Sequence, residues 1–371
     1  MSEYPTSNVR RVIVAGPFPP PVNGFSYITQ QMARALSERH QIITVNLAPG
    51  SHHGGIGYHL GRIGLAVRAL GTLFMHRRDG DRVFYIACDG NLGLVYTIAL
   101  CSAARALGYP LYLHHHSFGY IDRQSVLMKS LLSVTGQSAT HIFLCDAMAR
   151  RFASRYRKAI KGIVLSNSAF VAPSNPKRQR RRAGPLVIGL LSNLNEAKGL
   201  YVFLDVLRVA RNQGLDIAAA LAGPAQSVAD AEAIAKAGRE FGARLDYRGA
   251  VYGEAKEVFF DDIDVFLFPT RYSNEAQPTV IYEALSHGVP VISYDRGCIC
   301  DQLEDNGVVV PRDEPFADRA LEWLKARLNQ RSGLSTSKEI RLRFKSAQER
   351  SREQLTKVFD GSHGEFEPEC W

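Results

Sequence analysis

The sequence lacks a long apolar run, a Cys-x-x-Cys pair and a Gly-x-Gly-x-x-Gly loop. Its longest apolar stretch, 92–101, contains Thr97 and is about half as long as the ~20 residues of a membrane-spanning helix. The first 11 residues are polar and end in two arginines, so they have no apolar core of a signal peptide. We therefore expect a cytoplasmic protein that does not cross a membrane. The missing cysteine and glycine motifs disfavour a zinc or redox site and a dinucleotide site.

Acidic residues are scarce in the first half. Residues 1–183 hold 23 Lys and Arg against 7 Asp and Glu, a net charge of +16, whereas the remainder carries −7. Without the five bases that crowd into 177–182, the first half still carries +11. This asymmetry predicts that one domain meets an anionic surface or substrate. Anionic lipid fits better than nucleic acid, because base-stacking aromatic residues are not interleaved with the arginines.

Short apolar runs alternate with amphipathic stretches along the chain, which is typical of βαβ units in a parallel sheet. The predicted buried strands are 12–15, 42–47, 83–88, 111–113, 142–145, 163–165, 186–191, 217–222, 265–268, 289–293 and 308–310. Between the two groups, 172–185 holds three prolines and a basic cluster, the composition of a linker. The pattern predicts two successive α/β domains with a cleft, because parallel sheets bind ligands beyond the carboxyl ends of their strands.

The most specific segment is FLFPTRYSNEAQPTVIYEALSHGVPVIS, residues 266–293. It predicts a strand, a polar loop, a helix that starts at about Pro278 and a further strand. Proline suits the first turn of a helix, where its missing N–H is not needed. The amides of Ala276, Gln277 and Thr279 would then surround the positive end of that helix, where a diphosphate can bind.

Two carboxylates flank this anion site. Glu275 precedes the helix and Glu283 lies within it. Both would repel a phosphate, so we expect them to accept hydrogen bonds from hydroxyl groups instead. The diols of a sugar and of a ribose are the obvious donors.

The same segment resembles a known signature. Two glutamates separated by seven residues, after Phe-x-x-Pro and before Ala-x-x-x-Gly-x-Pro-Val, resemble the motif of family-4 retaining glycosyltransferases of the GT-B fold. The resemblance spans about 10–311 and is strongest over 186–300. It implies that Glu275 contacts hydroxyls of the donor sugar and that Glu283 binds the ribose of the nucleotide.

A second match is LLSNLNEAKG, residues 190–199, which resembles the family's Gly-Arg-Leu-x-x-x-Lys-Gly. The resemblance implies that Lys198 neutralises the donor diphosphate, as a compact ammonium can. Asn193 occupies the position of the family's arginine, so the site lacks one cation. Arg271, in the loop before Glu275, is our candidate for its replacement.

The N-terminal half matches less sharply. GPFPPPVNGFSY, residues 16–27, resembles the family's Pro-rich loop, in which Gly24 would let the backbone approach a ligand. His114, His115 and His116 end the fourth predicted strand, and the resemblance implies a place for His116 in the cleft, with Glu275 and Lys198 among the catalytic residues. We expect no metal site, because no second ligand cluster accompanies the three histidines.

The GT-B fold implies two Rossmann-like domains that face each other across a cleft. We expect an acceptor domain over 1–172, to which a C-terminal helix of about 336–371 returns, then a linker over 173–185 and a nucleotide-sugar donor domain over 186–335. The sugar of a nucleotide-diphosphate donor would pass with retention to a hydroxyl of a glycan, lipid-linked or other acceptor. Front-face attack of this kind needs neither a metal nor a cofactor.

The resemblance also implies a setting, namely bacterial-type polysaccharide or glycolipid synthesis at the inner face of a membrane. Two alternatives remain open. A catalytically degenerate scaffold or binding subunit is suggested by Asn193, and a nucleotide-sugar epimerase can share the fold. The nucleotide, the sugar, the acceptor and the linkage cannot be predicted from the sequence.

Overall fold

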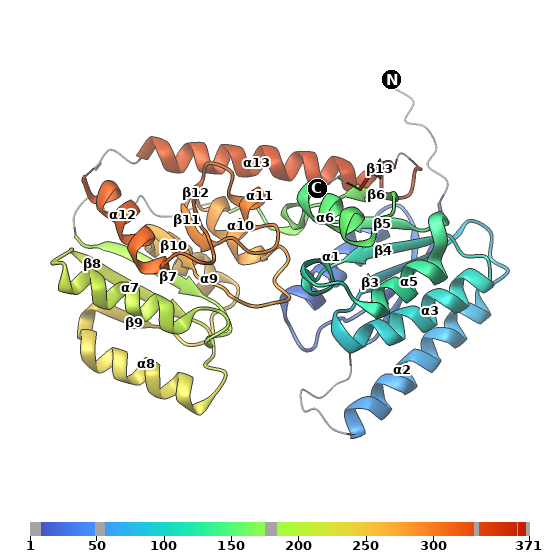
Figure 1. Ribbon diagram of the computed structural model, residues 1–371, viewed down its shortest axis with the longest axis horizontal. Helices are drawn as coiled ribbons and strands as arrows, with labels where there is room; N and C mark the ends of the chain where they lie inside the picture. Colours follow the sequence, from blue (N-terminus) through green and yellow to red (C-terminus); the bar gives the residue numbers. More distant parts are fainter. Residues whose placement is uncertain (1–8, 49–55, 175–183, 330–333, 362, 369–371) are drawn as a thin grey trace. The chain divides into compact units, whose positions relative to one another are not determined.

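The computed structural model describes residues 9–48, 56–174, 184–329, 334–361 and 363–368 (Figure 1). The chain divides into two compact units, an N-terminal unit of Met1–Phe170 with Glu353–Trp371 and a C-terminal unit of Val171–Arg352. Most of the predicted linker, 175–183, lies outside the described residues.

The N-terminal unit is built on a seven-stranded sheet in the order β13-β6-β5-β4-β3-β1-β2. All six predicted strands of this half are confirmed with bounds shifted by at most a few residues, and they pair in parallel. A short strand from the polar tail, which was not predicted, pairs antiparallel with β6. The strands are β1 (Arg11–Gly16), β2 (Gln41–Asn46), β3 (Arg82–Cys88), β4 (Leu111–His115), β5 (Thr140–Phe143), β6 (Ile160–Val164) and β13 (Gly364–Phe366).

Helices connect these strands. The first of them begins where Asn23 forms a capping box with Ser26, and it buries Ile28, Met32 and Leu36 in the core. The α-helices are α1 (Gly24–Ser37), α2 (Ile56–Met75), α3 (Leu94–Ala106), α4 (Gly119–Asp122), α5 (Val126–Thr135) and α6 (Asp146–Tyr156). The 3-10 turns are η1 (Asn91–Gly93), η2 (Gly136–Ser138) and η3 (Asn167–Phe170).

The C-terminal unit has a six-stranded parallel sheet in the order β12-β11-β10-β7-β8-β9. The chain order reverses between β7 and β10, so the loops that follow these two strands meet at a topological switch point. The five predicted strands are confirmed, whereas β9 was missed because only its first residue is buried. The strands are β7 (Leu186–Leu191), β8 (Ile217–Ala222), β9 (Leu245–Tyr247), β10 (Val265–Phe268), β11 (Val291–Tyr294) and β12 (Gly307–Val310).

The last long helix packs mainly with the C-terminal unit, where Ile340 and Phe344 are buried in its core. The C-terminal segment that belongs to the N-terminal unit begins at Glu353, and its Val358 and Phe359 are buried in the core of that unit. This segment is shorter than the predicted 336–371. The helices of this half are α7 (Leu200–Asn212), α8 (Val228–Phe241), η4 (Gly242–Arg244), α9 (Glu254–Asp262), α10 (Thr279–Ser286), α11 (Ile299–Leu303), α12 (Phe316–Asn329) and α13 (Leu334–Thr356).

The length and apolar content of a helix decide whether it can span a membrane. In the described part of the chain, no helix is both long enough and apolar enough to cross a bilayer.

Candidate active site

Two loops of the C-terminal unit meet at the switch point of its sheet. The loop after β7 leads to Gly199, whose φ of +89° and whose closeness to Pro269 exclude a side chain, since a Cβ would lie 2.5 Å from the Pro269 oxygen. The Arg271 amide donates to the Ala197 oxygen at 2.8 Å and ties this loop to the one that follows β10. The sequence therefore folds locally so that the two predicted motifs touch.

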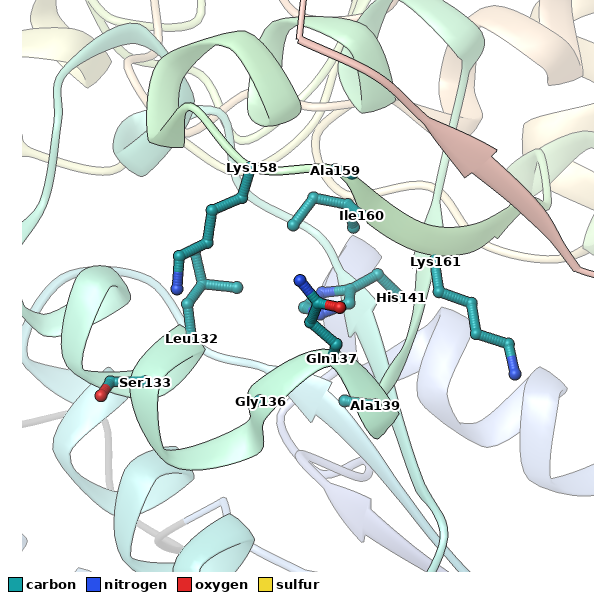
Figure 2. A pocket seen from close by; sticks show the side chains of 10 residues that line it. All are labelled: Leu132, Ser133, Gly136, Gln137, Ala139, His141, Lys158, Ala159, Ile160 and Lys161. Carbon is teal, nitrogen blue, oxygen red and sulfur yellow. The ribbon is translucent and has the colours of Figure 1, made fainter.

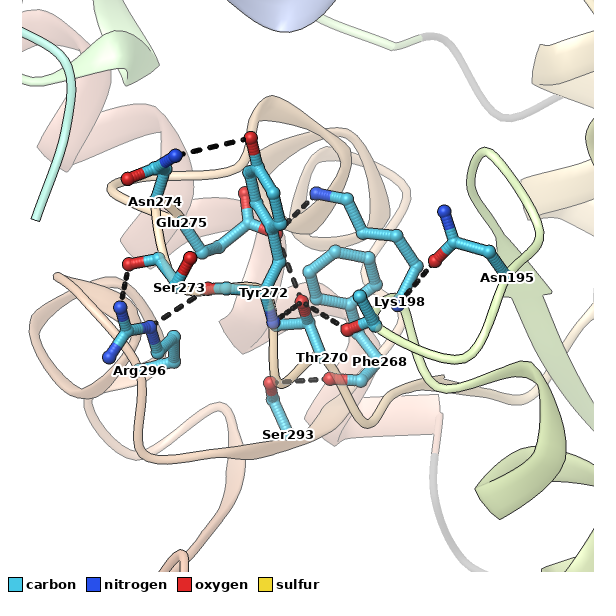
Figure 3. Close-up of polar contacts among 11 residues, drawn as sticks. Asn195, Lys198, Phe268, Thr270, Tyr272, Ser273, Asn274, Glu275, Ser293 and Arg296 are labelled. Atoms are coloured by element: carbon cyan, nitrogen blue, oxygen red, sulfur yellow. Dashed lines mark hydrogen bonds and ion pairs between the residues drawn. The ribbon is translucent and has the colours of Figure 1, made fainter. Parts of the chain in front are cut away.

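Lys198 and Glu275 meet between these loops. The Lys198 Nζ donates to the Glu275 Oε2 at 2.5 Å, and Thr270 Oγ1 donates to the same oxygen at 3.1 Å (Figure 3). The Lys198 ammonium also lies 4.5 Å from the ring centroid of Tyr272, a cation–π distance. Glu275 is only 8% exposed, and its carboxylate is held by the hydrogen bonds from Lys198 and Thr270. The structure brings together the two predicted catalytic residues of this unit.

The helix start beside Glu275 has the geometry of an anion site. Pro278 is the N-cap of α10, with no side chain that caps the first turn. Within the described residues, the backbone amides of Ala276 and Thr279 donate no hydrogen bond. Gln277, which lies between these two residues in the sequence, is buried. Backbone N–H groups at a helix start can bind a phosphate. The ligand roles of all three residues stay predictions.

Glu283 lies in α10 and is also part of an ion pair. Its Oε1 is 2.7 Å from the Nζ of Lys256 on α9, and its side chain is 18% exposed. Lys256 was not predicted, because no motif surrounds it and its partner is distant in the sequence. The ribose role of Glu283 stays a prediction.

Arg296 and Gly297 were also not predicted to belong to the site. The buried Arg296 guanidinium donates to the Tyr272 oxygen at 2.9 Å and to the Ser273 oxygen (Figure 3). Gly297 has a φ of +60°, and a Cβ there would lie 2.3 Å from the Ala276 oxygen. Both residues support the loop that carries Glu275. Their position directly after β11, at the carboxyl end of the sheet, was the available signal.

Asn193, which departs from the family pattern, and Arg271, its candidate replacement as a cation, lie in the same loops. Asn193 is exposed in the loop after β7. Arg271 donates from Nη2 to the Tyr294 hydroxyl at 2.7 Å, and its guanidinium lies 4.8 Å from the Tyr294 ring centroid. Arg271 is thus anchored at the end of β11, and its role as the replacement cation stays a prediction.

In the N-terminal unit His116 directly follows β4. Its ring centroid is 4.0 Å from that of His114 and 5.0 Å from that of Phe25 on α1, so His114 and His116 share a face as strand alternation predicts. The residue is partly exposed but its Nε2 is buried, and burial lowers the pKa of His116 to about 3. His116 is therefore a neutral imidazole near neutral pH.

The neighbouring histidines are neutral for the same reason. His115 Nε2 and His141 Nδ1 share a hydrogen bond of 2.8 Å, and His114 Nδ1 shares one of 2.6 Å with the Tyr85 hydroxyl. Burial first, and adjacent imidazoles second, lower the pKa values of His114 and His115. Among the described residues, no group of three His, Cys, Asp or Glu side chains is arranged to hold a metal ion.

Gly24 is the first residue of α1 and directly follows the loop after β1. The space beside its Cα is open, because no atom lies within 4 Å of a Cβ built there. Asn23, directly before it, caps the helix with a 3.0 Å hydrogen bond from the Ser26 amide. A ligand role for Gly24 stays a prediction.

A pocket of the N-terminal unit lies elsewhere (Figure 2). It is formed at the amino ends of β5 and β6, whereas Gly24 lies beyond the carboxyl end of β1, at the opposite ends of the parallel strands. Gln137 and Lys158 approach it with their polar groups, and His141 lies behind them (Figure 2). None of the predicted site residues lines this pocket.

Comparison with known proteins places the chain. Residues 185–326 match the family model described as glycosyl transferases group 1. No curated protein matches the sequence.

Several solved structures are similar over nearly the whole chain. HepE from Anabaena in complex with UDP has a TM-score of 0.69 at 15% identity, covering 95% of this chain and 100% of that one. Sucrose-phosphate synthase from Thermosynechococcus elongatus has a TM-score of 0.62 at 16% identity, with 94% and 95% covered. WaaG, a glycosyltransferase involved in lipopolysaccharide biosynthesis, has a TM-score of 0.62 at 12% identity, with 95% and 100% covered.

These likenesses confirm the predicted fold class, GT-B with two Rossmann-like domains. The match to the family model confirms the resemblance to glycosyl transferases group 1, whereas the family-4 subclass and the roles of the paired glutamates and Lys198 stay predictions. Over residues 185–326 this chain is similar to the glycosyl transferases group 1 family.

Proposed function

We propose that this protein is a retaining glycosyltransferase that moves a sugar from a nucleotide-diphosphate donor to a hydroxyl of an acceptor. The observation that carries the proposal is the 2.5 Å contact of Lys198 with Glu275, beside the start of the helix that bears Glu283. HepE in complex with UDP or with UDP-glucose supports a nucleotide-sugar donor.

Each residue then has a role in donor binding. Lys198 and the amides of Ala276, Gln277 and Thr279 bind the diphosphate and stabilise the charge that grows on it. Glu275 accepts hydrogen bonds from the donor sugar. The Lys198 ammonium then contacts both the diphosphate and the Glu275 carboxylate. Donor binding therefore loosens the Lys198–Glu275 contact and frees lone pairs of the carboxylate for sugar hydroxyls.

The reaction follows from this placement. The acceptor oxygen forms its bond to the anomeric carbon on the face from which the diphosphate leaves, and the departing phosphate oxygen takes the acceptor proton. Lys198 and Thr270 already occupy the Glu275 Oε2, which suits a binding role better than nucleophilic attack. The protein contributes orientation and electrostatic stabilisation. This scheme uses no metal and no cofactor.

The N-terminal unit would bind the acceptor. His116 and Gly24 follow β4 and β1 at the carboxyl edge of its sheet, and the neutral imidazole can donate or accept one hydrogen bond. The positive charge of residues 1–183 suits an anionic, lipid-linked acceptor. It also suits the anionic inner surface of a cell membrane. The likeness to WaaG supports a place in polysaccharide or glycolipid synthesis.

The test is a panel of nucleoside diphosphates and nucleotide sugars in thermal shift, since a ligand of the folded protein raises its melting temperature. The best donor is then used for transfer in buffer with a chelator, and NMR reports the anomeric configuration of the product. An inverted product would contradict retention, and loss of transfer with the chelator would contradict metal independence. Absence of stabilisation by every nucleotide would contradict the donor site.

Asn193 favours a second candidate, a catalytically degenerate scaffold, because the family's arginine is missing and the asparagine is exposed. Nucleotide binding without turnover of any donor would support that candidate. An epimerase would instead convert the donor sugar in the absence of an acceptor.

A further inference from the structure

Helix α2 exposes apolar side chains along one face. Ile63 is 50% exposed, Val67 61%, Phe74 56% and Met75 69%. The opposite face is buried through Ala69 and Leu73. An ordinary surface helix has polar residues on its outer side, and a contiguous exposed apolar patch usually marks an interaction site.

Two further apolar side chains are exposed in the elements that follow β3. Leu92 on η1 is 74% exposed and Val95 at the start of α3 is 50% exposed. Helix α2 lies beside α3 (Figure 1) and is held at two places: the Arg62 guanidinium lies 4.5 Å from the ring centroid of Tyr96 on α3, and the hydroxyl of Tyr109, after α3, donates to the Leu73 oxygen at 2.8 Å. The apolar side chains are thus displayed from packed helices.

The sequence segment that carries this surface holds charge of one sign. Between Glu38 and Asp79 the sequence has no acidic residue. Arg68 and Arg78 on this helix and just after it are exposed, and the Arg77 guanidinium lies 3.8 Å from the ring centroid of the exposed Phe74. Asp79, the first acidic residue that follows, is paired with Arg11 and His76.

We propose that this surface docks the protein on an anionic lipid bilayer. The α2 face, defined as Ile63, Val67, Phe74 and Met75 with Arg68 and Arg78, has the composition of a helix that lies in the membrane interface: apolar side chains enter the acyl boundary while arginines meet lipid phosphates. Lipid phosphates can pair with these arginines, whereas the same face of a second copy offers further arginines, so charge complementarity favours the bilayer. The proposal gives the membrane partner of the proposed function a defined surface, and it does not depend on the donor chemistry.

The test is sedimentation of the full chain with vesicles of phosphatidylcholine alone or mixed with phosphatidylglycerol. We expect binding to the mixed vesicles that falls steeply as salt rises. The double substitution Val67→Asp and Phe74→Asp should lower the partition coefficient at least tenfold, and Arg68→Glu with Arg78→Glu should do the same. The matched control is Val126→Asp on α5, a position of the same unit that is 77% exposed, and it should bind nearly as the parent does.

Three outcomes would overturn the proposal. They are parent-like binding by both double variants, no vesicle binding by the parent, and a parent dimer in solution that Val67→Asp with Phe74→Asp dissociates. Thermal melting of each variant shows that it is folded. Stabilisation by a nucleoside diphosphate is measured on the same samples, so failure of the donor site is seen separately from failure of docking.

Discussion

The two units share an architecture but differ in the ionisable groups at the carboxyl ends of their strands. Beyond the carboxyl ends of its strands, the C-terminal unit places ion pairs, Lys198 with Glu275 and Lys256 with Glu283. At the corresponding ends of its strands the N-terminal unit has His116, a neutral imidazole, and an ion pair of Asp89, which follows β3, with Arg62 of α2.

The difference shows that one sheet topology supports two kinds of surface, depending on which loops carry charge. Paired charges in partly buried loops can be redistributed when an anion binds, and they are strong because the surroundings are poorly solvated. Buried neutral histidines offer hydrogen bonds without charge. The comparison predicts that substitutions in the C-terminal unit change donor binding and turnover, whereas those in the N-terminal unit change stability with pH and attachment to lipid.

The largest expected effect is that of Lys198→Ala. Turnover should fall about 100-fold or more, because Lys198 is the proposed partner of the diphosphate and charge grows on that group in the transition state. Transfer of a labelled sugar measures the effect, and Lys198→Arg should recover only part of the rate. Lys345→Ala, at a 71% exposed side chain, is the control. Intact transfer by Lys198→Ala would show that the diphosphate binds elsewhere.

Glu283→Gln should weaken binding of the free nucleoside diphosphate by about 1–3 kcal/mol, since hydrogen bonds to a charged group are lost. Calorimetric titration gives the affinity. Glu322→Gln, at a 72% exposed side chain of α12, should leave it unchanged. Equal affinities of parent and Glu283→Gln would remove this residue from the site and weaken the contrast between the units.

Arg271→Ala sharpens the assignment of the missing cation. We expect turnover to fall about tenfold, the size of one hydrogen bond to a charged group and less than for Lys198, because Arg271 is anchored on Tyr294. Tyr294→Phe, which removes only the 2.7 Å hydrogen bond, should have a smaller effect on initial rates. A loss with Arg271→Ala as large as that with Lys198→Ala would make Arg271 the principal cation.

The smallest effect concerns stability of the N-terminal unit in acid. Burial lowers the pKa of His116 from 6.5 to about 3, so between these values the unfolded chain binds a proton that the folded chain does not, and stability falls as pH falls. His116→Phe removes this linkage and should reduce the slope of unfolding free energy against pH by up to about 1.4 kcal/mol per pH unit.

Urea denaturation of parent and His116→Phe at several pH values from 7 to 4 gives the two slopes. An unchanged slope would show that His116 is protonated as easily in the folded protein as in the unfolded chain. The N-terminal unit would then carry a titrating cation at its strand ends, and the contrast with the C-terminal unit would fail.

Strands and motifs could be predicted because their signals are local. Buried parallel strands are continuous apolar runs, so β8 and β10 have the predicted bounds. Edge strands such as β9 and β13 have few buried side chains and were missed. Lys256 and Arg296 were missed for a different reason, since each acts on a loop or helix more than 20 residues away in the sequence.

By itself, the sequence determined the order of strands and helices, the positions of Lys198, Glu275 and Glu283 on loops and a helix, and the unequal charge of the two halves, because each depends on neighbours in the chain. Only the tertiary structure decided that Lys198 reaches Glu275 across 77 residues, that burial keeps His116 neutral and that the apolar face of α2 is uncovered. The physical reason is that a periodic pattern shows which residues share a face, whereas contacts between distant segments decide what covers that face.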